Sequence, residues 1–92
     1  MAIKVKIPTS LRKLTANKDV VEVEASTVGE ALRAVEAEHA GLLAKIVDDN
    51  AGKVRRFINV YAGDEDVRYL DGLDTAVTDG TEISIIPAIA GG

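Results

Sequence analysis

The chain ends in two consecutive glycines, Gly91 and Gly92, which follow the short tail Ala88, Ile89 and Ala90. A carboxylate carried on two residues without side chains can be threaded into a narrow active site and activated there as an acyl group. Glycine also lets a partner's backbone approach closely, because it has no Cβ. The alternative interpretation is an unstructured end without a role, so the rest of the chain must decide between the two.

The side chains offer few other reactive groups. The chain contains no cysteine, which excludes a thiol nucleophile, disulfides and thiolate metal sites. His39 is the only histidine, which argues against a histidine metal centre or a Ser-His-Asp triad. The acidic turns at residues 48–49 and 64–66 lack the spacing of an EF-hand loop, so we interpret them as solvated and predict no metal site. Any sulfur chemistry must therefore use something other than a side-chain thiol.

Charge and hydropathy narrow the class of protein. The net charge of -4 argues against a nucleic-acid partner, and no apolar run is long enough to span a membrane. The N-terminus lacks a signal-peptide pattern, so we expect a cytoplasmic protein. With 92 residues the chain can build one small core, which must be aliphatic because aromatic residues make up only 3%.

Apolar residues that alternate with polar ones predict the strands. The predicted strands span residues 2–7, 19–24, 55–62, 67–69 and 81–86. The side chains expected to face the core are Val21, Val23, Ile58, Val60, Ile83 and Ile85. The first two strands should pair as a hairpin, with the polar stretch 9–18 between them as a loop. Residues 48–52, 63–66 and 79–80 are predicted turns.

One main helix is predicted to begin at Thr27 and to end near His39. Thr27 and Glu30 have the spacing of a capping box, in which the Thr27 hydroxyl accepts from the Glu30 amide and the Glu30 carboxylate accepts from the Thr27 amide. The apolar stripe of this helix consists of Val28, Ala31, Leu32 and Val35. A further helical turn is expected around residues 42–46, and an apolar turn around residues 73–77 is expected to pack under the sheet.

A hairpin, a crossing helix and a closing strand predict an α+β protein with the β-grasp fold. We expect a mixed sheet of four to five strands with the helix packed across it, in one domain of residues 1–87, followed by a flexible tail of residues 88–92. Four apolar residues near the tail, Phe57, Tyr61, Ile86 and Pro87, are candidates for partner docking. The alternative is that they are exposed without a role, as single apolar residues often are.

The ending from Asp79 to Gly92 has a turn, an alternating strand, a proline and a short tail to Gly-Gly. It resembles the β-grasp sulfur-carrier family, which includes the thiamin-pathway carrier, the small subunit of molybdopterin synthase and the carrier of a cysteine-biosynthesis route. Residues 7–12, 56–61 and 64–69 resemble the cysteine-biosynthesis branch most. Ala88 stands where the molybdopterin subunit often has a second proline, which weakens that alternative.

The resemblance implies that the chain is a protein co-substrate without a bound cofactor. An E1-like partner would use Mg-ATP to adenylate the Gly92 carboxylate, and sulfur would then displace AMP and leave a thiocarboxylate. A pyridoxal-phosphate-dependent cysteine synthase would accept the sulfur, and a metalloprotease would release cysteine. The five residues after Pro87 can extend about 17 Å, enough to enter a buried site. Two further alternatives are a ubiquitin-like modifier, joined through Gly92 to a target lysine, and a binding domain with an inert tail.

Overall fold

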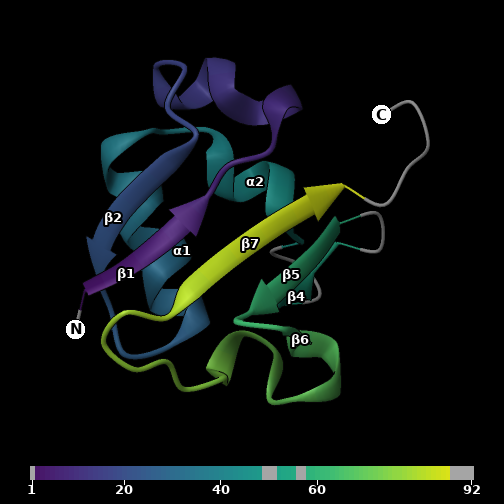
Figure 1. Cartoon of the computed structure of the whole chain (residues 1–92). Coiled ribbons are helices and arrows are strands. Elements are labelled where there is room, and N and C mark those ends of the chain that lie inside the picture. Colours follow the sequence, from purple (N-terminus) through teal and green to yellow (C-terminus); the bar gives the residue numbers. More distant parts are fainter. Residues whose placement is uncertain (1, 49–51, 56–57, 88–92) are drawn as a thin grey trace.

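The computed structural model describes residues 2–48, 52–55 and 58–87, and its main feature is one five-stranded sheet (Figure 1). The strand order is β2-β1-β7-β5-β6, with β7 in the centre. The strands are β1 (Ala2–Lys6), β2 (Val20–Glu24), β5 (Ile58–Ala62), β6 (Glu65–Asp66) and β7 (Glu82–Pro87). β1 and β7 are parallel and the other neighbours are antiparallel, so the sheet is mixed, as predicted.

The sheet has one apolar inner face, because its strands alternate in the predicted way. β1 and β2 form the expected hairpin, in which Ile3 lies opposite Val23 and Val5 opposite Val21. All four of these side chains are buried, whereas Lys4 and Lys6, on the other face of β1, are exposed. The inward positions predicted for the other two long strands, Ile58, Val60, Ile83 and Ile85, are also buried.

Helix α1 (Val28–Glu38) covers the inner face of the sheet and buries the whole predicted stripe (Figure 1). The Thr27 hydroxyl accepts from the Glu30 amide at 3.1 Å, as predicted. The Glu30 carboxylate, however, accepts from the amide of Ser26 at 2.8 Å, one residue before the predicted partner. Thr27 is extended and lies in an isolated bridge with Ala76, a tertiary contact that the sequence pattern of a capping box does not include.

The predicted further turn is helix α2 (Leu42–Ile46), and a carboxylate of α1 organises its start. Glu36 accepts from the amide of Gly41 at 3.0 Å and from that of Leu43 at 2.8 Å. These hydrogen bonds hold the pKa of Glu36 below its ordinary value of 4.5, because they stabilise the charged form. Gly41 has a φ of 102°, a left-handed conformation that side chains with a Cβ disfavour.

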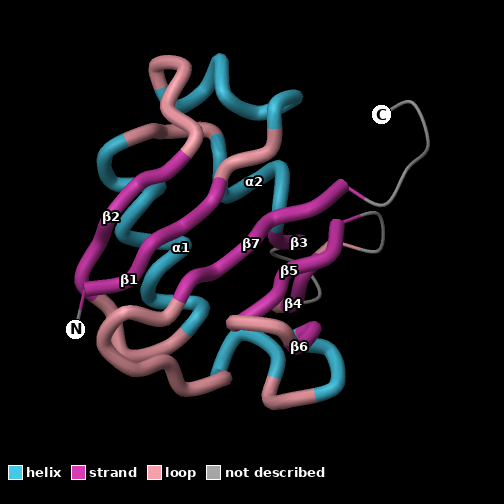
Figure 2. Tube along the Cα trace, in the orientation of Figure 1, coloured by secondary structure: helices cyan, strands magenta, loops and turns pink. Residues whose placement is uncertain are grey.

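The segment between β1 and β2 differs from the prediction. Residues 9–18 were expected to be a loop, but the 3-10 helix η1 (Thr9–Thr15) occupies most of them (Figure 2). Thr15 is fully buried, and its hydroxyl lies 2.9 Å from the Lys18 carbonyl oxygen and 3.2 Å from that of Arg12. A buried hydroxyl between two carbonyls thus orders a stretch whose composition is polar.

Two short strands, β3 (Val47–Asp48) and β4 (Lys53–Val54), form a second, two-stranded sheet that the sequence did not predict. Between them lie residues 49–51 of the predicted turn, which are outside the described residues. For the strand predicted at residues 55–62, the structure gives β5 at Ile58–Ala62 and places Arg55 outside any strand, while residues 56–57 are not described. The prediction was therefore correct for the core of β5 and too long at its start.

The connection from β5 to β7 also differs from the prediction. The predicted strand at 67–69 is the 3-10 helix η2 (Val67–Tyr69), and the two residues before it, predicted as a turn, form β6. A third 3-10 turn, η3 (Gly72–Asp74), follows. Val77 is buried as expected, but Ala76 is exposed. Among the described residues no helix is long and apolar enough to cross a membrane.

Candidate partner-docking surface and tail exit

The central strand β7 carries the chain to one end of the sheet, beside the start of β5 (Figure 1). The last two pairs of this antiparallel ladder are Asn59 with Ile86 and Ile58 with Pro87. The predicted adenylation site Gly92 and the predicted threading residues Ala88, Ile89, Ala90 and Gly91 lie outside the described residues. The structure therefore defines the place from which the tail departs.

Pro87 occupies a ladder position where its missing N–H costs no bond to β5. The Gly63 amide donates to the Glu82 carbonyl at 2.9 Å, which fixes the alternation of the ladder. Every second pair along the ladder from Gly63 and Glu82 is hydrogen-bonded, so the pair of Asn59 and Ile86 is hydrogen-bonded and the pair of Ile58 and Pro87 is not. The backbone N–H and C=O groups of Ile58 therefore point away from Pro87. Proline is tolerated at such positions because it has no donor to contribute.

Two of the four predicted docking residues, Tyr61 and Ile86, lie near each other on the outer face of the sheet. Ile86 is 47% exposed and Tyr61 is half-buried. Tyr61 lies opposite Ser84 and Ile86 opposite Asn59, so the two are diagonal neighbours, within reach of an aromatic side chain. They form an outer apolar pair at the tail end of β7.

Of the other two predicted docking residues, the structure describes only Pro87, and Pro87 does not join this pair. Pro87 is half-buried and lies opposite the buried Ile58, so alternation places it on the other side of the strand from Ile86. Phe57 lies outside the described residues. The docking role of all four residues remains a prediction.

An open groove of about 360 Å³ lies between the end of β7 and the start of η1. The groove is lined by Lys6, Ile7, Pro8, Thr9, Arg12, Ser84, Ile85, Ile86 and Pro87. Arg12 donates from Nε to the Ile7 carbonyl at 3.1 Å, and the Lys6 ammonium lies 3.7 Å from the Glu82 carboxylate. One side of the tail exit therefore presents basic groups beside apolar surface.

One residue of the predicted acidic turns, Asp66, serves as a local cap. The Asp66 carboxylate accepts from the Arg68 amide at 2.9 Å and caps η2. No cluster of three or more histidine, aspartate or glutamate side chains that could hold a metal ion occurs in residues 2–48, 52–55 and 58–87. Asp49 is outside the described residues.

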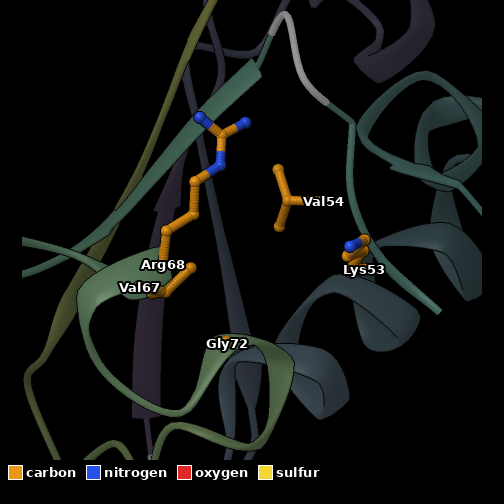
Figure 3. Close-up of a pocket in the computed structure, with 5 residues that line it drawn as sticks. All are labelled: Lys53, Val54, Val67, Arg68 and Gly72. Carbon is orange, nitrogen blue, oxygen red and sulfur yellow. The ribbon is translucent and has the colours of Figure 1, made fainter. Parts of the chain in front are cut away.

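Sequence reasoning missed one residue near the tail exit, Arg68. Its guanidinium donates to the carbonyl oxygens of Arg55 and Ile58 and to the side chain of Asn59. It also lines a cavity of about 540 Å³, and Figure 3 shows its side chain extending past Val54, away from Gly72. The partners are 9 to 13 residues away in sequence, so no local pattern could have revealed this role.

A hairpin, a helix across a mixed sheet and a central C-terminal strand define a ubiquitin-like protein of the β-grasp fold, as predicted. The chain belongs to the ThiS family, whose model matches residues 5–92. The predicted resemblance to β-grasp sulfur carriers is thereby confirmed.

Relatives match the chain from end to end. The sulfur carrier protein CysO of Mycobacterium tuberculosis is 41% identical over 93 residues that cover both chains fully. The small archaeal modifier protein 3 of Haloferax volcanii is 35% identical over 95 residues, also covering both fully. One chain of the crystal structure of the Amycolatopsis orientalis BexX/CysO complex is 47% identical, with a TM-score of 0.90 over 98% of this chain and 99% of that one. These relatives are named as carriers or modifiers, and the chain is likewise a protein co-substrate.

Proposed function

We propose that this protein is a sulfur carrier whose Gly92 carboxylate is converted to a thiocarboxylate. The observation that carries the proposal is the end-to-end identity of 41% with a sulfur carrier protein. The sequence of the tail supports it, because Gly91 and Gly92 follow the strand that ends at Pro87. The proposal requires Gly92 to be the last residue of the mature chain.

A carboxylate is a poor acyl donor because its oxygen is a poor leaving group, and adenylation replaces that oxygen with AMP as the leaving group. The Gly92 carboxylate attacks the α-phosphorus of Mg-ATP on an E1-like partner, which forms an acyl adenylate and releases pyrophosphate. Sulfide then attacks the acyl carbon and expels AMP, which leaves a thiocarboxylate. Because the chain has no cysteine, this group would be the only thiol-type sulfur that it can present.

The fold supports this chemistry through geometry alone. The globule stays outside the partner's active site while the five residues after Pro87 reach about 17 Å into it. The outer apolar pair, Tyr61 and Ile86, offers a docking surface at the base of the tail. The crystal structure of the BexX/CysO complex supports the idea that a chain of this shape binds another protein.

We further place the carrier in cysteine biosynthesis. Three segments, at residues 7–12, 56–61 and 64–69, support this branch by their sequence likeness. The partners would be a pyridoxal-phosphate-dependent cysteine synthase, which supplies the acceptor, and a metalloprotease, which frees the product. The need for ATP favours a cytoplasmic location.

Intact-mass spectrometry tests the proposal. The chain is incubated with an active E1-like enzyme, Mg-ATP and sulfide, and then alkylated with iodoacetamide. We expect a mass gain that corresponds to exchange of one oxygen for sulfur, followed by a single alkylation. The control is a variant lacking Gly91 and Gly92, which should gain neither. If the full chain gains no sulfur from a demonstrably active enzyme, the proposal is wrong.

A second candidate is a protein modifier, which the identity with the small archaeal modifier protein 3 favours. In this function a lysine amine, rather than sulfide, attacks the Gly92 adenylate and forms an isopeptide bond. Expression of an N-terminally tagged chain in cells distinguishes the two. High-mass conjugates that resist hydroxylamine, and that disappear without Gly92, would favour the modifier.

A further inference from the structure

The Arg68 guanidinium makes three hydrogen bonds, two to the start of β5 and one to the segment before it. Nη2 donates to the Ile58 carbonyl at 2.5 Å and to the Arg55 carbonyl at 2.6 Å. Nη1 lies 3.1 Å from the Asn59 side-chain oxygen. Ile58 and Asn59 are the two residues that lie opposite Pro87 and Ile86, the last residues of β7.

Arg68 takes the place of a strand at the edge of β5. The neighbouring strand β6 pairs only with Tyr61 and Ala62 and does not reach Ile58. The ladder alternation points the Ile58 carbonyl away from Pro87, toward this open edge. The guanidinium supplies the donor there that a longer β6 would have supplied.

The same group also ties β5 to the segment before it, which is anchored elsewhere. The Arg55 amide donates to the Ile46 carbonyl at 2.8 Å, and Nε of Arg55 donates to the Ala44 carbonyl at 2.8 Å. The Ile58 amide donates to the Arg55 carbonyl at 3.1 Å. Arg68 therefore adds a second link between the start of β5 and the segment that Arg55 anchors to α2, so loss of its three contacts is expected to loosen the last two pairs of the β5–β7 ladder.

On the basis of the proposed function, we infer that Arg68 is a positioning residue for tail activation. It acts through Ile58 and Asn59, which hold the end of β7 and so fix the direction in which the tail enters the partner. Lysine cannot replace it, because an ammonium on a flexible stem lacks the planar fork that spans several acceptors. The effect should fall on productive docking, because the hydrogen bonds of the Arg68 guanidinium go to Arg55, Ile58 and Asn59, which support the end of β7.

The test compares Arg68→Lys with the matched control Arg33→Lys, on the exposed side of α1. Both keep the net charge, and both are assayed where circular dichroism shows them folded. The initial rate of thiocarboxylate formation is measured against the concentration of the carrier. We expect Arg68→Lys to raise the KM for the carrier about tenfold, as loss of one charge-assisted hydrogen bond would, and to leave kcat within about twofold. A KM equal to that of Arg33→Lys would overturn the positioning role.

Amide hydrogen exchange of the isolated protein tests whether Arg68 stabilises the start of β5. We expect the amides of Ile58 and Asn59 to exchange about tenfold faster in Arg68→Lys, whereas Ile3 in β1 keeps its rate. Unchanged exchange at Ile58 and Asn59 would overturn the inference. If the wild-type chain gains no sulfur, the proposed function fails, and the reaction role of Arg68 fails with it. Normal sulfur loading with an unchanged KM would remove the role of Arg68 alone.

Discussion

Pro87 lies directly opposite Ile58, at the last position of the ladder between β7 and β5. Proline has no N–H, so the central strand ends at a residue that cannot donate a further ladder bond. Ile58 is buried and held by backbone contacts on its other side, which gives the end of β7 a fixed partner. The tail therefore departs from a defined point of the globule, as threading into a partner requires.

Ile86→Lys should weaken docking without unfolding the protein. Ile86 is 47% exposed on the outer face, so a lysine there costs little burial. If Ile86 belongs to the docking surface, the KM of the activating enzyme for the carrier should rise about tenfold, as for a truncated interface anchor. The control is Val20→Lys, an exposed valine at the far edge of the same sheet. Equal KM values for both variants would place docking elsewhere.

Gly92→Ala and Gly91→Ala should block activation and leave the fold intact. A Cβ at either position would obstruct a narrow tail channel, and misplacing the reacting carboxylate by about 1 Å costs about a hundredfold in rate. The time course of sulfur gain by intact mass measures the effect, with Ala88→Gly as a control that keeps both glycines. A folded Gly92→Ala variant that gains sulfur at the normal rate would contradict the threading argument.

Thr27→Ala should destabilise the start of α1. The Thr27 hydroxyl accepts from the Glu30 amide at 3.1 Å, and loss of such a cap lowers the free energy of unfolding by about 1 kcal/mol. Urea unfolding followed by circular dichroism measures the change. Thr9→Ala, at an exposed threonine of η1, is the matched control and should change stability little. A Thr27→Ala variant as stable as that control would show that the cap contributes nothing.

Glu36→Gln should destabilise the protein more at neutral pH than at low pH. The pKa of Glu36 is lowered in the folded state by hydrogen bonds from the Gly41 and Leu43 amides. Its charged form therefore contributes stability above the ordinary value of 4.5, and this contribution disappears as the pH falls through the lowered folded pKa.

Urea unfolding at pH 7 and at pH 3 measures this difference, with the exposed Glu38→Gln as the control. At pH 7 only the Glu36 variant should unfold at lower urea than the wild type. At pH 3 the deficit of the Glu36 variant should be smaller than at pH 7, because more of the wild-type carboxylate is protonated. A deficit of Glu36→Gln that is equally large at both pH values would mean that packing, and not charge, is responsible.

Sequence periodicity predicted the parts of the fold that one buried face determines. Ile3 and Val5 in β1, and Ile83 and Ile85 in β7, alternate with residues that face the other side of the sheet, and Leu32 belongs to the apolar stripe of the helix. Both patterns predict burial on one side, and all five of these residues are buried. The predictions were wrong where tertiary contacts determine the local structure, as in residues 9–18 and 67–69. Three residues, Val67 to Tyr69, are too few to separate a strand from a 3-10 turn.

The candidate site was predictable only in part, for the same reason. Alternation places Tyr61 and Ile86 on the outer face, and the structure agrees. Alternation also places Pro87 and Ile86 on opposite faces of the sheet, although the two residues are adjacent in the sequence. Arg68 was not predictable, because its acceptors are backbone carbonyls brought close by the fold.

Locating the sulfur within the chain tests the central claim most directly. After activation and alkylation the protein is digested with trypsin, which leaves residues 69–92 as one peptide because no lysine or arginine follows Arg68. Tandem mass spectrometry then assigns the label. Sulfur carriage by the tail predicts one alkylated sulfur, dependent on ATP, at the carboxyl group of Gly92. An ATP-dependent label on any other peptide, or an unmodified Gly92 after treatment with an active enzyme, would contradict it.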